Sequence, residues 1–484
     1  MPSVRSTDAV ILPPNAEPRH YDLSLTPDMR AFTFDGVVDI VVDIVADTST
    51  LVLHSKELTY YDKTTFTTTD GAVTKATSHT TDYGRTTVTF AFGSALAAGE
   101  GGTLHIEFKG ILNNDMCGFY RSTYKTVEGE ERFMLSTQFE ALDARRCFPC
   151  WDEPARKATF GTQLIVDANL TAFSNMPVTE LTLLAGAKKS LTFAPTPKMS
   201  SYLLAFVIGE FDYLQAHTKD GVAVRVYTPP GQTEQGRFSL DVAVKSIEFY
   251  DECVNRAFSL PLTMSSMGAN PAHTFELLHN LTCRYFGVRY PLPKLDMVAI
   301  PEFAAGAMEN WGLVTYRSID LLVNADTASS QQLQRVATVV THELAHQWFG
   351  NLVTMEWWDD LWLNEGFASW MMTFVADELF PSWSVWPQYC SNEMARAMTL
   401  DALKTSHPIQ VPIKEAEEVE QVFDAISYYK GGSVVRMVHA VIGAGELILC
   451  TVTFCANSAH DLTCPPSYYN LIKRALPRRS RALL

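Results

Sequence analysis

The sequence predicts a multidomain α/β protein, in which a β-rich N-terminal domain precedes a domain dominated by long helices. The chain has 484 residues, which at roughly 100–200 residues per domain leaves room for two to four domains. It is 47% hydrophobic and contains 27 Phe, 18 Tyr and 9 Trp, enough apolar surface for a large core. The period of the hydrophobic pattern changes along the chain from two residues to about 3.6.

The first predicted domain covers residues 1–213 and is a sheet domain. Apolar and polar residues alternate over 37–45, 86–92 and 103–108. This alternation places successive side chains on opposite faces of a strand, so each stretch is expected to be half buried. Because such stretches recur about every ten residues between turn signals, the region predicts many short strands.

The second predicted domain covers residues 214–443 and is richer in helices. Apolar residues recur at helical spacing over 238–250, 331–349 and 367–380. A proline at each end of 381–387 predicts a loop there. The two domains are therefore expected to differ in their dominant secondary structure.

Composition and charge exclude several classes of protein. Only 19% of the residues are charged, below the roughly 25% typical of soluble domains, which excludes disorder as the main state. The net charge of −16 argues against a nucleic-acid partner or an anionic membrane surface. The nine cysteines are scattered and odd in number, which is typical of reduced thiols, and the first residues lack the apolar segment of a secretory signal. We therefore expect a cytoplasmic protein with no membrane partner.

The strongest chemical signal is a His-Glu-x-x-His motif at residues 342–346, inside the predicted helix 331–349. Residues four apart lie on one face of a helix, so the imidazoles of His342 and His346 can reach the same ion. Glu343 follows the first histidine and is expected beside the ion, where a carboxylate can take a proton from a bound water.

A third metal ligand is predicted at Glu365, near the start of the next predicted helix. Two antiparallel helices joined by a turn of this length would return Glu365 to the ion. Two histidines and one glutamate leave a fourth position open, which is typical of a catalytic rather than a structural zinc site. A third histidine at the alternative spacing is absent, since Leu352 occupies that position. One zinc ion per chain is the predicted cofactor.

Three further motifs resemble one known family, the M1 zinc aminopeptidases. Residues 306–310 are Gly-Ala-Met-Glu-Asn and precede the His-Glu-x-x-His motif, in the order found in that family. The stretches 136–154 and 425–432 also resemble the family, most closely its puromycin-sensitive cytosolic branch. The resemblance covers roughly residues 10–252 and 284–443. It implies a saddle-like β domain followed by a thermolysin-like α+β catalytic domain.

The resemblance also implies which residues bind the substrate. Glu140 and Glu309, with Gln138, are the positions that would hold a cationic α-amine. The strand edge along which the family's substrates lie corresponds to Gly306, Ala307, Met308, Glu309 and Asn310. The family's Tyr-x-Lys-Gly pattern places the hydroxyl that stabilises the oxyanion on Tyr428, with Tyr429 as the less favoured candidate.

Together these features predict a zinc metalloaminopeptidase that removes the N-terminal residue from peptides with a free N-terminus. In the implied mechanism, zinc and Glu343 activate water, and Tyr428 stabilises the oxyanion. An epoxide hydrolase of the leukotriene A4 type is one alternative, although such enzymes usually have Gly-Gly where this chain has Gly306-Ala307. A catalytically impaired, truncated product that acts at most as a binding or regulatory protein is the other.

Two segments depart from the family pattern. Residues 253–283 have no recognisable family counterpart and are expected to be an unusual insert. The resemblance stops near residue 443, so residues 444–484 are expected to be a tail, and the helical C-terminal domain of the family is expected to be missing. These patterns carry no prediction of the oligomeric state.

Overall fold

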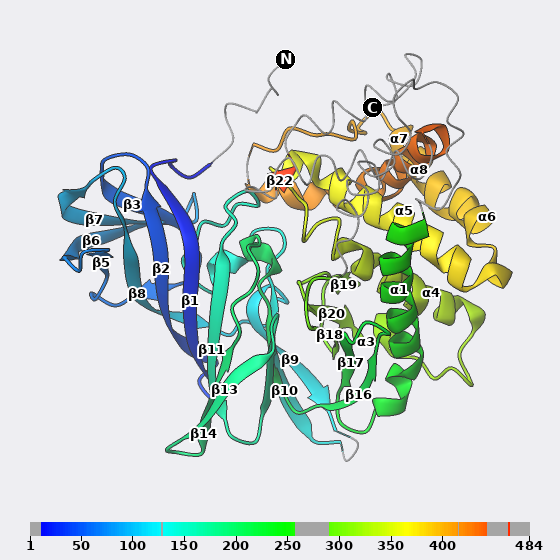
Figure 1. Ribbon diagram of the computed structural model, residues 1–484, viewed down its shortest axis with the longest axis horizontal. Coiled ribbons are helices and arrows are strands. Elements are labelled where there is room, and N and C mark those ends of the chain that lie inside the picture. The colour runs from blue at the N-terminus through cyan, green and yellow to red at the C-terminus, as the bar shows by residue number, and fades with distance from the viewer. Residues whose placement is uncertain (1–10, 127–128, 257–289, 415, 443–462, 465–484) are drawn as a thin grey trace, which may run out of the picture.

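The computed structural model describes residues 11–126, 129–256, 290–414, 416–442 and 463–464. Two predicted segments therefore cannot be placed. Most of the predicted insert, from residue 257 onward, lies outside the described residues, and so does the predicted tail except for residues 463 and 464. The predicted order of a β-rich domain followed by a mixed domain with long helices is confirmed (Figure 1).

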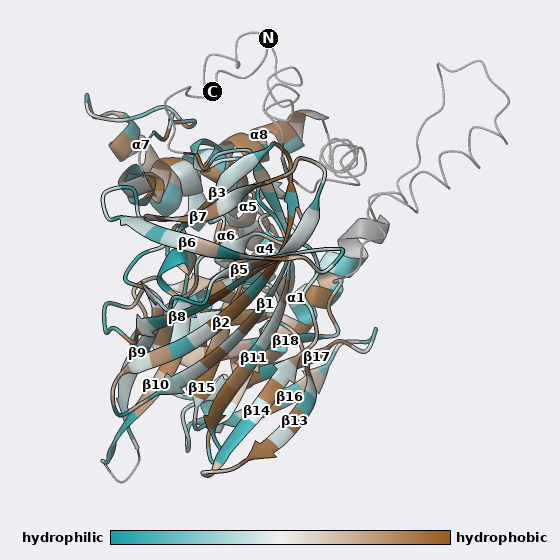
Figure 2. Ribbon diagram, turned by 90° about the vertical axis from the view of Figure 1, so that its left-hand side faces the viewer, coloured by the Kyte–Doolittle hydropathy of each residue, from teal (hydrophilic) through white to brown (hydrophobic). Residues whose placement is uncertain are grey.

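The N-terminal domain is built on a large twisted sheet of 11 strands. Its strands are β1 (Ala16–Asp28), β2 (Thr33–Ile44), β3 (Thr48–His54), β4 (Thr59–Tyr60), β5 (Thr65–Thr68), β6 (Val73–Asp82), β7 (Thr87–Leu96), β8 (Gly101–Ile111), β11 (Thr159–Asp167), β13 (Val178–Leu184) and β14 (Lys188–Phe193). They lie in the order β13-β14-β11-β1-β2-β8-β5-β6-β7-β3, and β4 pairs with β8. Buried residues alternate with more exposed ones along β1 and β2, as the sequence pattern over 37–45 predicts for β2. Figure 2 shows the hydropathy of these strands.

A smaller sheet of four strands completes this domain. Its strands, in the order β12-β15-β10-β9, are β9 (Gly118–Lys125), β10 (Glu131–Gln138), β12 (Thr171–Ser174) and β15 (Phe206–Gly209). The ring of Phe119 lies 5.2 Å from Phe34 of the large sheet and 4.9 Å from Phe206, so an aromatic core joins the two sheets. Because β10 ends at Gln138, the chain reaches Glu140 directly beyond the sheet.

The second domain combines a five-stranded sheet with the long helices. The sheet contains β16 (Asp212–His217), β17 (Ala223–Thr228), β18 (Lys294–Ile300), β20 (Leu313–Arg317) and β19 (Ala307–Met308), in that order, so β19 is an edge strand. The helices are α1 (Arg237–Arg256), α3 (Ser318–Leu321), α4 (Ser330–His346), α5 (Leu361–Leu379), α6 (Val385–Tyr389), α7 (Ala395–Asp401) and α8 (Gly431–Ile442). A two-stranded pair, β21 (Thr354–Met355) and β22 (Thr463–Cys464), lies beside them. No helix in the described ranges is long and apolar enough to cross a membrane.

The predicted helices form, with shifted ends. The helix predicted over 331–349 is α4, which begins one residue earlier because Ser329 and Gln332 form a capping box, and which ends at His346. The helix predicted over 367–380 is α5, which begins six residues earlier, at Leu361, so Glu365 lies within the helix. The loop predicted over 381–387 is wrong, because short helical turns occupy both Pro381–Trp383 and α6. Proline is compatible with the first turn of a helix, where its missing N–H leaves no bond unmade.

Buried polar side chains join the two domains. The ammonium of Lys294, on β18, donates to the carbonyl oxygens of Ser174 (2.7 Å) and Gly312 (2.9 Å). The same ammonium lies 2.7 Å from the carboxylate of Asp296, so its charge is compensated. The amide of Asn175 donates to the carbonyl of Trp311 at 3.0 Å. The relative position of the domains therefore depends on specific bonds as well as on apolar contact.

Lys294→Met provides a test of this junction. We expect the variant to be destabilised by about 3 kcal/mol, because two carbonyl groups each lose a donor and the buried Asp296 loses its ammonium partner, keeping the guanidinium of Arg225 at 3.2 Å. Urea unfolding followed by tryptophan fluorescence measures the change. Lys63→Met is the matched control, since Lys63 forms an exposed ion pair with Glu107 at 2.6 Å and should contribute little. Equal stability of the two variants would contradict a structural role for the Lys294 junction.

Candidate metal centre

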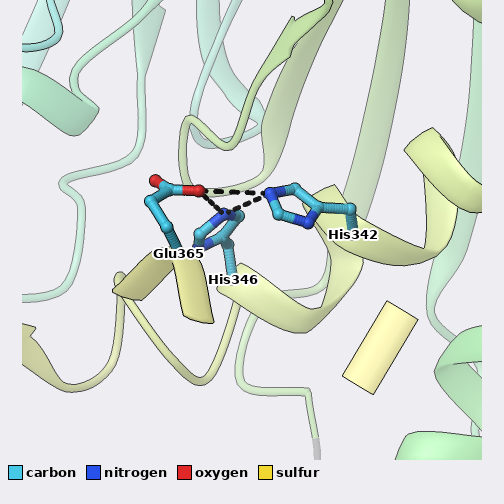
Figure 3. A group of neighbouring side chains, drawn as sticks. All are labelled: His342, His346 and Glu365. Atoms are coloured by element: carbon cyan, nitrogen blue, oxygen red, sulfur yellow. Dashed lines mark hydrogen bonds and ion pairs between the residues drawn. The ribbon is translucent and has the colours of Figure 1, made fainter. Parts of the chain in front are cut away.

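Two packed helices bring the predicted metal ligands together. His342 and His346 lie one turn apart on α4, and Glu365 lies on α5, which packs against α4. Their ring nitrogens and carboxylate oxygen point toward one another (Figure 3). The two Nε2 atoms are 3.0 Å apart, and Oε2 of Glu365 is 3.3 Å from Nε2 of His342 and 3.5 Å from Nε2 of His346. The ligand atoms of all three residues lie within 4.8 Å of one another, which forms a candidate metal-binding cluster.

Local packing fixes this arrangement. The apolar residues Val336, Val340 and Leu344 are buried on α4, and the α5 residues around Glu365 are almost all buried. A helix that is apolar on all sides belongs in the interior of a protein, and α5 lies there. The hydroxyl of Tyr250, on α1, donates to the carbonyl of Thr341 at 2.7 Å and so ties α1 to the ligand helix.

A glycine contact determines how closely the next helix approaches Glu365. A Cβ atom added to Gly366 would lie 2.8 Å from the carbonyl carbon of Gly431, at the start of α8. Helices approach this closely only where neither contributes a side chain. The same contact positions the helical turn Ile426–Lys430, which carries Tyr428 and precedes α8. Glu365 and Tyr428 are therefore held on backbones that touch.

The tautomer of His346 suits a metal ligand. Its Nδ1 lies 2.9 Å from the carbonyl oxygen of Phe349, and a carbonyl can only accept, so Nδ1 carries the proton. Nε2 is then free to face the cluster. A hydrogen bond of this kind orients a metal-binding imidazole and raises its basicity. Gly350 makes the turn possible, because its φ of +136° favours glycine and a Cβ there would lie 3.0 Å from Nδ1 of His346.

Four carboxylates, including that of the predicted ligand Glu365, gather at the cluster with low solvent exposure. Glu309, Glu343 and Glu365 are buried, and Glu140 is partly exposed to the cavity. Burial raises the pKa of Glu140 and Glu343, and the neighbouring charge of Glu309 raises both further. Burial also raises the pKa of Glu309. Like charges gathered out of water are unfavourable unless a cation compensates them.

The neighbouring charges also shift the pKa values of the predicted ligands Glu365 and His346. Burial alone would raise the pKa of Glu365, but the charge of His346 and hydrogen bonds from His342 and His346 lower that pKa to about 2. Burial disfavours a charged imidazole, yet Glu309 and Glu365 raise the pKa of His346 well above its ordinary value. The carboxylates thus favour a positively charged group at the point where the three ligand atoms meet. A divalent cation fits this donor set, since two imidazoles and one carboxylate are typical zinc ligands.

A cavity of about 660 Å³ opens onto the cluster and brings most predicted site residues together. Its lining includes the predicted residues Gln138, Glu140, Ala307, Glu309, His342, Glu343, His346, Glu365 and Tyr428. Both domains contribute, because Gln138 is the last residue of β10 and Glu140 follows it, whereas the others belong to the second domain. Oε2 of Glu343 and Oε1 of Glu140 are buried without hydrogen-bond partners among the described residues. Such oxygens are suited to a bound ligand or solvent.

Three of the predicted substrate-binding residues are not among those that line the cavity. The carbonyl of Gly306 accepts the backbone N–H of Arg317 at 2.9 Å. The sulfur of Met308 accepts from the amide of Gln138 at 3.5 Å. The amide of Asn310 donates to Thr315 at 3.1 Å. Gly306, Met308 and Asn310 therefore hold the segment in place and do not line the cavity themselves.

The two candidate tyrosines have different surroundings. The ring of Tyr428 lines the cavity and stacks on the imidazole of His342, with the centroids 5.8 Å apart and the planes at 17°. Tyr429 is not among the cavity residues, and its carbonyl accepts the hydroxyl of Tyr389 at 2.9 Å. Only Tyr428 is placed beside the predicted ligands.

Sequence reasoning missed the rest of the cavity wall. Phe423 and Val419 line the cavity from the segment before Tyr428, and Asp143 and Arg146 line it from the segment after Glu140. Arg146 is paired with Asp143 at 2.6 Å. Arg146 and Val419 lie in short 3-10 helices, and Asp143 and Phe423 lie in a turn and a bend, so no amphipathic period marks these residues in the sequence. Their closeness in sequence to Tyr428 and Glu140 was the only available signal.

Comparisons with known proteins agree with this geometry. A model of the peptidase M1 N-terminal domain matches residues 17–203, and a model of the peptidase family M1 domain matches residues 272–461. The chain is 46% identical over 452 residues to a protein of Arabidopsis thaliana named aminopeptidase M1, covering 93% of this chain and 47% of that protein. It is 43% identical over 440 residues to the alanine/arginine aminopeptidase of Saccharomyces cerevisiae, covering 90% of this chain and 47% of that protein.

The comparisons cover both domains. The second model match includes part of the predicted insert and part of the predicted tail. The chain spans about half the length of these curated relatives. The two domain models follow one another in the order of the two observed domains, and the relatives match across nine-tenths of the chain. The chain therefore belongs to the M1 family of peptidases.

Proposed function

We propose that this chain is a zinc-dependent aminopeptidase that hydrolyses the first peptide bond of peptides with a free N-terminus. One observation carries the proposal: a cluster of three metal-ligand atoms and a separate pair of carboxylates, Glu140 and Glu309, face the same cavity. An enzyme that removes a single N-terminal residue needs both features at a fixed separation, since it must recognise the α-amine and cleave one residue away.

His342, His346 and Glu365 would hold the zinc ion. When bound, zinc supplies Lewis acidity, which polarises a carbonyl group and lowers the pKa of water. Glu343 lies on the same helix, next to His342, with one carboxylate oxygen unpaired. We assign it the general base, which takes a proton from the attacking water and passes it to the leaving amine.

Glu140 and Glu309 would bind the cationic α-amine of the substrate, with Gln138 beside them. These carboxylates are close enough to Glu365 to form a second group of oxygens within 4.8 Å. A cationic amine relieves the repulsion between them, so binding is electrostatically favourable at this end of the cavity. The segment from Gly306 to Asn310 includes edge strand β19, along which an extended peptide can lie.

The phenol of Tyr428 would donate to the oxyanion that forms when water attacks the carbonyl. Its ring lies parallel to the imidazole of His342, and the residue is part of the cavity wall. A preorganised donor of this kind stabilises negative charge in the transition state without reorganisation. Burial raises the pKa of Tyr428 well above its ordinary value, so the hydroxyl keeps its proton for donation.

The alternative functions gain no supporting observation. The relatives named above are aminopeptidases, whereas neither printed name refers to an epoxide hydrolase. An impaired binding protein would not require the unpaired oxygen of Glu343 or the tyrosine beside His342. The cytoplasmic location stays a prediction from the sequence, and one similar yeast protein, 43% identical over 449 residues and covering 90% of this chain and 42% of that protein, is named aminopeptidase 2, mitochondrial.

Removal and return of the metal tests the proposed cofactor. We expect one zinc ion per chain by atomic emission, and a melting temperature that falls after chelation and recovers with added zinc, because bound cation stabilises only the folded chain. Glu365→Gln should weaken zinc binding by more than about 10-fold, since changes even at groups behind the ligands reach that size. Glu378→Gln, at an exposed residue of the same helix, is the control. Unchanged zinc affinity in Glu365→Gln would refute the ligand set.

Glu343→Gln tests the general base. The amide cannot accept the proton from water, so kcat on aminoacyl fluorogenic substrates should fall by about 10²- to 10⁴-fold while zinc content stays at one per chain. Glu248→Gln is the control, because this carboxylate accepts the backbone N–H of Lys219 at 2.7 Å and is not among the cavity residues. A Glu343→Gln variant with full kcat would remove the assigned base.

The paired variants Tyr428→Phe and Tyr429→Phe test the oxyanion donor. Tyr428→Phe keeps the ring stacked on His342 and removes only the hydroxyl, so kcat should fall by about 100- to 1000-fold with little change in KM. Tyr429→Phe should leave kcat nearly unchanged. Steady-state kinetics on the same substrate separates the two tyrosines, and a larger loss in Tyr429→Phe would reverse the assignment.

A further inference from the structure

Two fully buried amide side chains lie directly after the His-Glu-x-x-His motif. Gln347 follows His346 at the end of α4, and Asn351 lies in the turn beyond it. Both are 0% exposed. Buried amides are costly unless their hydrogen bonds are made, so the partners they choose show what the amides hold in place.

Both amides bind the same backbone group. Nε2 of Gln347 lies 3.2 Å from the carbonyl oxygen of Glu309, and Nδ2 of Asn351 lies 2.7 Å from the same oxygen. Among the described strands, β19 pairs only with β20, and it ends at Met308. The two amides therefore bind the chain one residue beyond the end of this edge strand. Carbonyls accept two donors at most, and both positions on this carbonyl are filled.

Gln347 also ties this segment to α4. A second bond of its Nε2 goes to the carbonyl of Glu343 at 3.1 Å, and its Oε1 accepts the backbone N–H of Gly312 at 3.4 Å. The segment from Glu309 to Gly312 is thus fastened to the helix that carries His342 and His346. Asn351 is anchored to the same helix, because its backbone N–H donates to the carbonyl of His346 at 3.0 Å.

The Asn351 side chain keeps its bond to Glu309 although one of its own polar atoms stays without a hydrogen bond. Its Oδ1 is buried without a hydrogen-bond partner among the described residues. Turning the amide over would place this oxygen against the carbonyl of Glu309, which is also an acceptor, so only the present orientation is allowed. A buried oxygen left unpaired lowers stability, and the structure retains it together with the 2.7 Å bond to Glu309.

We propose that Gln347 and Asn351 are positioning residues that fix Glu309 relative to the metal-binding histidines, and thereby limit cleavage to the first peptide bond. The inference rests on the proposed function, in which Glu309 binds the α-amine. The carboxylate of Glu309 lies 3.8 Å from Nδ1 of His346. Residues of an extended peptide advance about 3.3 Å each, so a displacement of about one ångström is enough to mismatch amine and scissile carbonyl.

The test uses Asn351→Leu and Gln347→Met, which approximate the shape and remove the donors. We expect KM for aminoacyl fluorogenic substrates to rise about tenfold, the effect of one lost buried hydrogen bond, with kcat and zinc content nearly unchanged. Asn351→Asp is the second variant at this position, because it keeps the volume and places an acceptor against the carbonyl. Asn15→Leu is the matched control, since Nδ2 of Asn15 donates to the carbonyl of Thr50 at 3.2 Å in the N-terminal domain.

A binding measurement separates positioning from general damage. In a Glu343→Gln background, which binds without turnover, calorimetry compares a peptide carrying a free N-terminus with its N-acetylated form. The unmodified site should prefer the free amine, and the Asn351 and Gln347 variants should lose about tenfold of that preference. Variants that keep the full preference would overturn the positioning role alone. A parent chain that shows neither hydrolysis nor preference would overturn both this inference and the proposed function.

Discussion

The structure depends on one electrostatic constraint, the concentration of four carboxylates around two imidazoles inside a cavity. Glu309, Glu343 and Glu365 are buried, and Glu140 faces them from the other domain. Burial raises the pKa of Glu140, Glu309 and Glu343, and repulsion from neighbouring carboxylates raises these pKa values further. The charges of Glu309 and Glu365 raise the pKa of His346, so a compensating cation is favoured at this group. The proposed metal and the proposed cationic amine satisfy the same requirement, one at each end of the acidic group.

This constraint explains why the cavity is built from two domains. The N-terminal domain contributes Gln138 and Glu140 where β10 ends, and the second domain contributes the two helices with the metal cluster. Neither domain contains all of the cavity residues, so their arrangement depends on a rigid junction between the domains. Its buried bonds, from Lys294 to Ser174 and from Asn175 to Trp311, meet close to the segment that carries Glu309. The bonds that join the domains therefore also help to keep Glu140 of one domain close to Glu309 of the other.

The sequence predicted the candidate metal cluster better than the shape of the cavity around it. The His-Glu-x-x-His spacing and Glu365 identified a cluster that the structure brings together, because helical periodicity and a short connection leave little freedom. Strand alternation predicted the sheet domain for a similar reason. Helix ends were less certain, since capping at Ser329 and the early start of α5 depend on tertiary packing. The wall formed by Val419, Phe423, Asp143 and Arg146 belongs to turns and short 3-10 helices, where a periodic hydrophobic pattern cannot be recognised.

Four chemically identical carboxylates acquire different properties from their surroundings alone. Glu365 contacts both imidazoles, and its pKa falls to about 2, so it stays ionised as a ligand must. Glu343 is one residue from His342, but one of its oxygens has no hydrogen-bond partner in the described part of the chain and its pKa is raised by burial, which suits an exchangeable proton. Glu309 keeps its backbone clamped by two amides while its carboxylate remains available to the cavity. These acids therefore differ in their contacts and not in their chemistry, and the neutral amides of Gln347 and Asn351 supply the contacts that hold the backbone of Glu309.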